Sequence, residues 1–77
     1  MNTKITDVII HVDEPLNSSQ FEEIADAVRS DRGAISVGRN SERPNFLMVA
    51  YNANRTRSSS ILEKITGLGL HASLVGI

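Results

Sequence analysis

The apolar residues of this chain of 77 residues follow two kinds of spacing, which succeed each other along the sequence. Four segments alternate apolar and polar residues, as half-buried strands do, and two repeat apolar residues at every third or fourth position, as amphipathic helices do. We predict strands at residues 5–12, 34–38, 45–52 and 70–75, and helices that begin at 18–19 and at 58–60. The predicted order is therefore strand, helix, strand, strand, helix, strand.

This order restricts the fold of a short chain. Two such units with short connections are typical of the ferredoxin-like sandwich, in which two helices cover one face of a four-stranded antiparallel sheet. We therefore predict an α+β, ferredoxin-like βαββαβ fold in which residues 1–77 form a single domain. The strand at 45–52 is apolar on both faces, so we place it in the centre of the sheet.

Local signals predict where the helices begin and end. Ser18 or Ser19 is the expected N-cap of the first helix, and residues 58–60 are the expected caps of the second. Gly33 is expected to end the first helix in the left-handed conformation, and residues 67–69 to end the second. Apolar positions that share a face are Val8, Ile10 and Val12, then Phe21, Ile24, Ala25 and Val28, then Leu47, Val49 and Tyr51.

Composition excludes several functional classes. The chain has no cysteine, which excludes disulfides, iron–sulfur clusters and thiol nucleophiles. Eight Lys and Arg against nine Asp and Glu give a net charge of -1, without the basic excess that duplex binding needs. No segment predicts a membrane span or a signal peptide, so we expect a cytoplasmic protein that binds neither nucleic acid nor membrane. With no triad and no phosphate loop, we expect no enzymatic activity.

Four segments resemble a known family. Residues 48–56, MVAYNANRT, are similar to V-x-Y-D-P-x-x-T of the heavy-metal-associated, copper-chaperone-like domains. Residues 61–75, ILEKITGLGLHASLV, look like their final helix and strand, I-x-x-A-I-x-x-x-G-Y-x-A-x-L-V. Residues 21–28 and 34–37 resemble the core of their first helix and second strand. The resemblance covers nearly the whole chain and implies the same βαββαβ fold.

The resemblance also implies where a metal would bind. Domains of this family hold Cu(I) or Zn(II) with two cysteines in G-M-x-C-x-x-C between the first strand and the first helix. In this chain the two cysteine positions fall at Asn17 and Gln20, and the methionine position falls near Pro15. Asn17 and Gln20 offer neutral amide oxygens, which are weak ligands for a soft metal. The expected role is therefore a binding module without a cofactor, a protein-interaction or adaptor domain of metal-domain ancestry.

Two other binding functions remain open at the same end of the sheet. His11 and His71 are expected on neighbouring strands, on the face away from the helices, where they and Asp13 could hold Zn(II), Ni(II) or Cu(II). Alternatively, Asp13, Asn17 and the amides that follow Ser18 could receive a small molecule, as in regulatory domains that act as dimers.

The uncovered face of the sheet is the predicted interaction surface. It should carry an apolar patch ringed by His11, His71 and arginines, and an exposed apolar patch indicates a partner. The partner is an unknown protein or a second copy of the chain, as a homodimer. The residues predicted for this surface are Ile9, Phe46, Met48, Val75, Arg39, Arg43, Arg55 and Arg57.

Overall fold

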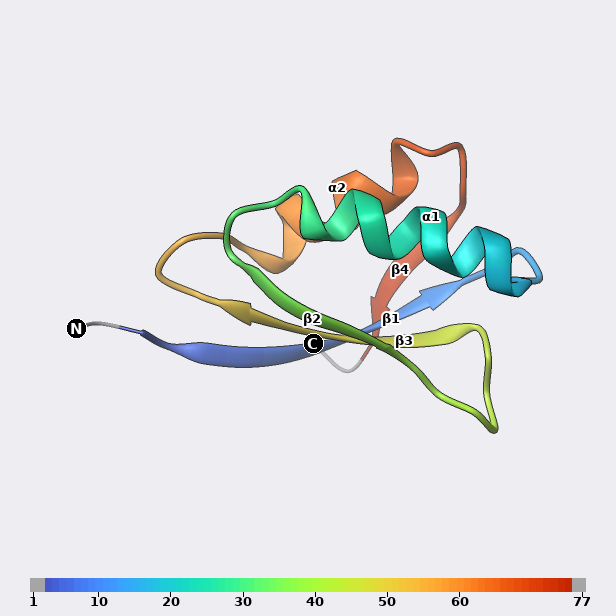
Figure 1. Cartoon of the computed structure of the whole chain (residues 1–77), viewed down its shortest axis with the longest axis horizontal. Coiled ribbons are helices and arrows are strands. Elements are labelled where there is room, and N and C mark those ends of the chain that lie inside the picture. The colour runs from blue at the N-terminus through green and yellow to red at the C-terminus, as the bar shows by residue number, and fades with distance from the viewer. Residues whose placement is uncertain (1–2, 76–77) are drawn as a thin grey trace.

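A four-stranded antiparallel sheet with two helices on one face forms the fold (Figure 1). The computed structural model describes residues 3–75. Its elements are β1 (Ile5–Val12), α1 (Ser18–Arg29), β2 (Ala34–Arg39), β3 (Phe46–Asn52), α2 (Ser58–Thr66) and β4 (Ala72–Val75). The strand order is β2-β3-β1-β4, so β1 and β3 are central. The predicted ferredoxin-like fold is confirmed.

The core lies between the sheet and the helices. The face of β1 with Val8, Ile10 and Val12 is buried, as the alternation predicts, and so is the matching face of β3. These strands pack against the apolar stripes of α1 and α2, where side chains such as Ile24 and Ile61 are fully buried. The other face of the sheet is open, because both helices lie on the same side (Figure 1).

The helix caps differ from those predicted. The N-cap of α1 is Asn17, in an extended conformation, and Ser18 is already helical. The N-cap of α2 is Arg57, which makes no side-chain capping bond, and residues 58–60 form the first helical turn. A serine caps a helix only where its own backbone is extended, and here the residue before each serine run takes that conformation.

Gly33 does not adopt the predicted left-handed conformation. Among residues 3–75 the one residue with a positive φ is Gly69, at 88°, which follows α2 as predicted. Gly33 has a different reason for lacking a side chain. A Cβ atom there would lie 2.4 Å from Cγ2 of Thr56, so glycine allows the α1–β2 turn to pack against the β3–α2 connector.

Strand β4 is shorter than predicted. It begins at Ala72, whereas the alternation predicts a start at residue 70. The last pair between β1 and β4 is Val12 with Ala72, and His71 directly precedes this pair. The His71 carbonyl oxygen accepts a hydrogen bond from the Asp13 amide at 2.8 Å. Strand β4 therefore begins two residues later than predicted. Within residues 3–75, no helix has the length and apolar character needed to cross a membrane.

Candidate functional site

The β1–α1 loop holds its two amide side chains in a reciprocal capping box. Oδ1 of Asn17 accepts from the Gln20 amide at 2.8 Å, and Oε1 of Gln20 accepts from the Asn17 amide at 3.0 Å. These are the positions at which the family resemblance puts the two cysteines. Both side-chain oxygens therefore close the first turn of α1, which satisfies two amides that a helix start otherwise leaves unpaired.

Replacing Asn17 with alanine is expected to lower the free energy of unfolding by about 1 kcal/mol, because the Gln20 amide loses its acceptor. Urea unfolding followed by circular dichroism measures this loss. Ser18→Ala is the matched control, and we expect it to change stability by less than about 0.5 kcal/mol. Equal losses for both variants would mean that Ser18 contributes to the cap.

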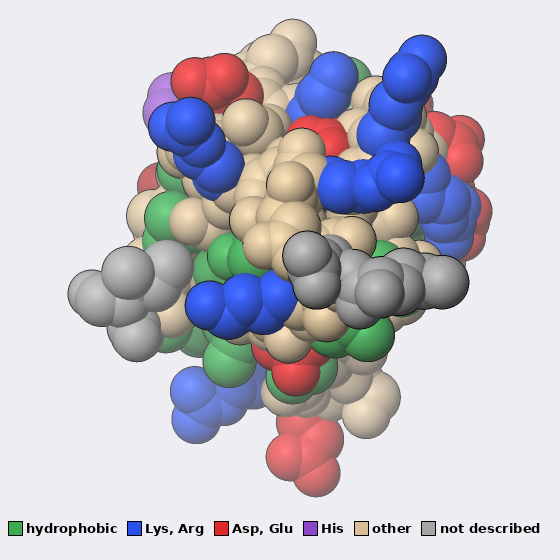
Figure 2. All heavy atoms as spheres, turned by 90° about the vertical axis from the view of Figure 1, so that its left-hand side faces the viewer, with side chains coloured by type: hydrophobic (Ala, Val, Ile, Leu, Met, Phe, Trp, Pro, Cys, Tyr) green, Lys and Arg blue, Asp and Glu red, His purple; other side chains and the backbone are tan. Residues whose placement is uncertain are grey.

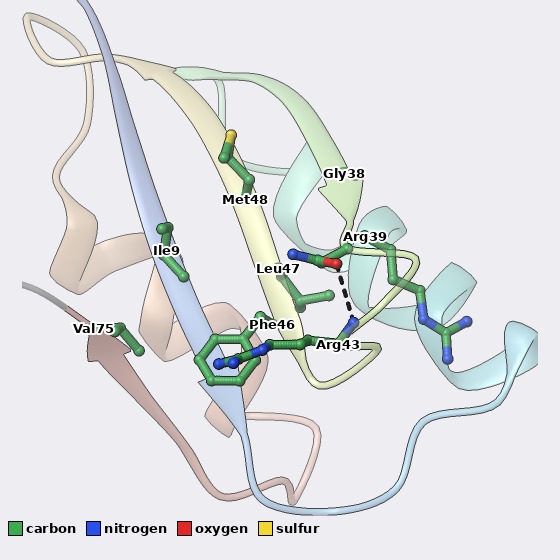
Figure 3. A pocket seen from close by; sticks show the side chains of 9 residues that line it. Ile9, Gly38, Arg39, Arg43, Phe46, Leu47, Met48 and Val75 are labelled. Carbon is green, nitrogen blue, oxygen red and sulfur yellow. Dashed lines mark hydrogen bonds between the residues drawn. The ribbon is translucent and has the colours of Figure 1, made fainter.

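Arg39 belongs to the loop scaffold rather than to the open face. Its guanidinium donates to the carbonyl oxygen of Leu16 through one terminal nitrogen, and Nε donates to the Pro44 carbonyl at 3.4 Å. The same guanidinium lies 5.7 Å from the Phe21 ring centroid. The side chain therefore points away from the hollow that its backbone borders (Figure 3). It ties the β2–β3 hairpin to the β1–α1 loop.

The two histidines form separate pairs. His11 is opposite Ser73 on β4 and Phe46 on β3, so His71 is not its direct cross-strand neighbour. Nδ1 of His11 lies 3.2 Å from the Asp13 carboxylate. His71 contacts Glu14 instead: its Nδ1 is 2.6 Å from Oε2, and its amide donates to Oε1 at 2.9 Å. In the described part of the chain, no three His, Asp or Glu side chains gather as metal ligands would.

Glu14 is the site residue that sequence reasoning missed. Its neighbour Asp13 was the expected ligand, and nothing in the local pattern indicates a contact with a residue 57 positions away. Hydrogen bonds from the His71 side chain and amide lower the pKa of Glu14 below its ordinary value of 4.5. The same side-chain bond, with the attraction of the carboxylate, raises the pKa of His71 above 6.5. The pair tethers the loop to the start of β4.

This tether should act within a limited pH range. The lowered pKa of Glu14 gives a contribution that is complete above pH 4.5 and is lost as the pH falls through the lowered pKa. The raised pKa of His71 gives a contribution that is complete below pH 6.5 and is lost as the pH rises through the raised pKa. Both contributions are therefore largest together between these two values.

Replacing Glu14 with glutamine should move the NMR titration of the His71 ring to lower pH, because the carboxylate that favours the imidazolium is gone. The stability difference between wild type and Glu14→Gln should be largest between pH 4.5 and 6.5 and shrink on either side. Glu42→Gln, in the β2–β3 hairpin, is the matched control. An unchanged His71 titration in Glu14→Gln would contradict the assigned pair.

The open face of the sheet carries a hollow of about 570 Å³. Its floor is formed by cross-strand neighbours, because Met48 on β3 and Val75 on β4 both lie opposite Ile9 on β1. Phe46 closes one end, where the Arg43 guanidinium lies 5.7 Å from its ring centroid (Figure 3). The four predicted apolar residues are therefore brought together, with Arg43 at their rim.

The remaining predicted cations lie at the opposite end of the molecule. Arg55 and Arg57 lie in the β3–α2 connector and line a second, polar hollow of about 300 Å³. Backbone bonds hold this connector against Lys4 and against the turn that follows Arg32: the Ala53 amide donates to Lys4 and the Asn52 amide to Gly33, both at 2.7 Å. Figure 2 faces this end, where Lys and Arg side chains gather. The predicted surface is thus two surfaces, one apolar and one cationic.

Comparison with solved structures finds the same fold in three proteins, two of which are described as copper domains. A copper-binding domain from HMA7, a P-type ATPase, has a TM-score of 0.80 and 16% identity, over 91% of this chain and 93% of that one. Oxidized MerP from Ralstonia metallidurans CH34 has a TM-score of 0.83 and 15% identity, over 95% and 100%. The yeast copper transporter domain Ccc2a has a TM-score of 0.79 and 21% identity, over 91% and 94%.

This chain has their ferredoxin-like fold. No protein-family model and no curated protein matches its sequence. At these identities the likeness concerns the fold alone, so the function has to be argued from the side chains. The residues that bear on it are the capped loop, the two histidine pairs and the open-face hollow.

Proposed function

We propose that this protein is a heavy-metal-associated-like domain that works as a non-catalytic protein-interaction module and binds its partner through the open face of the sheet. The observation that carries the proposal is the apolar hollow on that face, formed by Ile9, Phe46, Met48 and Val75. Ile9, Met48 and Val75 are 38%, 52% and 37% exposed, although each is a large apolar side chain. Adjacent apolar side chains left in water favour association with another surface.

The chemistry of the β1–α1 loop supports an interaction module over a metal carrier. A soft metal needs thiolate ligands, and the corresponding positions here are amides whose oxygens cap α1. The histidines are engaged with separate carboxylates. Metal binding through His11, His71 and Asp13 remains the alternative, and a small ligand at Asp13, Asn17 and the first amides of α1 is the other.

Site-specific crosslinking tests the proposal directly. A benzophenone side chain in place of Met48, in cells of the source organism, should give a covalent adduct that mass spectrometry resolves into a defined protein. The matched control puts the same group at Glu23, on the exposed side of α1. The purified partner should then bind wild type at least tenfold more tightly than Met48→Asp. Adducts from position 23 alone, or from neither position, would overturn the proposal.

An amide-resolved NMR titration separates the alternatives. The chain is titrated in separate runs with Zn(II), Ni(II), reduced copper and a mixture of amino acids. We expect no saturable shifts in any run. Stoichiometric shifts at His11 and His71 with a metal would favour the metal alternative. Shifts at residues 17–20 with a metal would mean that the loop binds without sulfur, and shifts there with the amino acids would favour the small-ligand alternative.

A further inference from the structure

We propose that the open face binds a second copy of the chain, in a two-fold dimer in which the strands of the two sheets run in opposite directions. This inference rests on the proposed function, because it names the partner of the same surface. The open face is built of rows that cross the strands. Its central row is Val75, Ile9, Met48 and Gly38, which are successive cross-strand neighbours on β4, β1, β3 and β2.

The central row has the composition that a two-fold axis requires. Residues on such an axis meet their own copies, so a charge there would meet a like charge. The central row contains no charged residue, and its Ile9, Met48 and Val75 side chains are exposed. Gly38 leaves space at the β2 end, since the nearest atom to a Cβ built there is 3.9 Å away. A second copy can therefore cover this row with the same apolar side chains.

Opposite charges lie on the two sides of the central row. On one side, Asp7 of β1 is exposed on the open face, opposite Ala50. On the other side, Arg43 lies over Phe46, and no carboxylate among the described residues pairs with it. Asp13, which lies at that end as well, is held by His11. Asp7 and Arg43 therefore lie on opposite sides of the central row.

A two-fold axis along the central row exchanges these sides. It places Asp7 of each copy over His11 of the other, in the same row as Phe46 with Arg43 over its ring, so Asp7 and Arg43 approach each other twice across the interface. The alternative axis, parallel to the strands, would keep Asp7 near Asp7 and Arg43 near Arg43. Like charges across an interface disfavour it. The net charge of -1 gives the two copies little overall repulsion.

The size of the face sets the expected affinity. Four strands about 4.8 Å apart and about seven residues long, with a rise of about 3.3 Å, give a plane of roughly 400 Å². This is small beside the surface of about 800 Å² per partner that standard interfaces bury. We therefore expect a concentration-dependent dimer with a dissociation constant of about 10 to 500 µM, rather than a permanent one.

Sedimentation equilibrium of the purified chain, with NMR spectra over the same concentrations, tests the dimer. We expect a monomer–dimer equilibrium, with concentration-dependent shifts centred on Ile9, Met48 and Val75. Met48→Glu should weaken association at least tenfold, because it puts two like charges at the axis. Glu23→Arg, on α1, is the matched control and should leave association within about twofold of wild type. A monomer at millimolar concentration would overturn the proposal, as would an equally strong dimer of Met48→Glu.

A charge exchange tests the direction of the strands. Asp7→Arg and Arg43→Asp should each weaken association by about tenfold, since each creates like charges across the interface. The double variant D7R/R43D restores opposite charges and should associate within about threefold of wild type. A double variant that associates no more tightly than the single variants, or single variants that associate as tightly as wild type, would overturn the arrangement.

The outcome is distinguishable from the crosslinking result. If the purified chain stays monomeric while position 48 crosslinks to a different protein, the second copy is wrong and the interaction module stands. If the chain is monomeric and position 48 gives no adduct, both proposals fail. An adduct of twice the mass of the chain, together with the dimer in solution, supports both.

Discussion

Replacing Ile10 with alanine is expected to lower the free energy of unfolding by about 3 to 4 kcal/mol. Ile10 is fully buried on the central strand β1, and it pairs with Leu47 on β3 and Leu74 on β4. The three deleted carbons would leave a cavity between the neighbouring strands and the helices that cover them. These elements cannot all shift to fill it. A domain of this size has a stability of only a few kcal/mol, so we expect the variant to be largely unfolded at 25 °C.

Urea unfolding, followed by circular dichroism with the slope checked for two-state behaviour, measures this loss. Ile10→Val is the graded control and should cost about 1 kcal/mol. Ile9→Ala, one residue away on the open face, should cost much less, because that side chain is already 38% exposed. A loss below about 1 kcal/mol for Ile10→Ala would contradict the buried environment assigned to it.

Gly33→Ala is expected to destabilise the fold by about 2 to 3 kcal/mol. The added methyl group would lie 2.4 Å from Cγ2 of Thr56, 2.7 Å from its Cβ and 3.0 Å from its backbone nitrogen. Thr56 cannot simply turn away, because its hydroxyl donates to the Asp31 carboxylate at 2.7 Å. The backbone cannot easily retreat either, since the Asn52 amide donates to the Gly33 carbonyl at 2.7 Å.

The clash with Thr56 gives this prediction a second test. Thr56→Ser removes Cγ2 but keeps the hydroxyl that bonds to Asp31. In the double variant G33A/T56S, we expect recovery of about 1 kcal/mol relative to the sum of the single changes, because the shortest contact is gone. Recovery should be partial, since Cβ and the backbone nitrogen of Thr56 remain close. Strict additivity of the two changes would show that the loss has a different cause.

The sheet and the core could be predicted because hydrophobic periodicity is a local signal. Alternation identified the buried faces of β1 and β3, and the two-faced strand at 45–52 identified a central strand. The helical stripe through Ile24 and Val28 likewise identified the side of α1 that packs on the sheet. In each case a residue's environment follows from its position within its own element.

The parts that sequence reasoning missed depend on distant residues. Gly33 is required by Thr56, which is 23 positions away, and Glu14 is held by His71, which is 57 positions away. Arg39 was assigned to the open face because alternation says nothing of the Leu16 carbonyl that turns its side chain away. The prediction that Arg55 and Arg57 border the same surface as Arg43 was wrong for a similar reason. These two residues follow β3 at the end opposite to Arg43.

The Asn17–Gln20 cap gives the start of α1 a conformation that does not depend on the redox state of the cell. Two thiols at these positions would change with oxidant, with the supply of metal and with exchange between carriers. Carboxamides do not titrate, form no disulfide and release no ion, so the bonds between Asn17 and Gln20 are the same under reducing and oxidising conditions. The redox state of the cell therefore does not alter this cap, whereas pH still acts on the same loop through the Glu14–His71 pair.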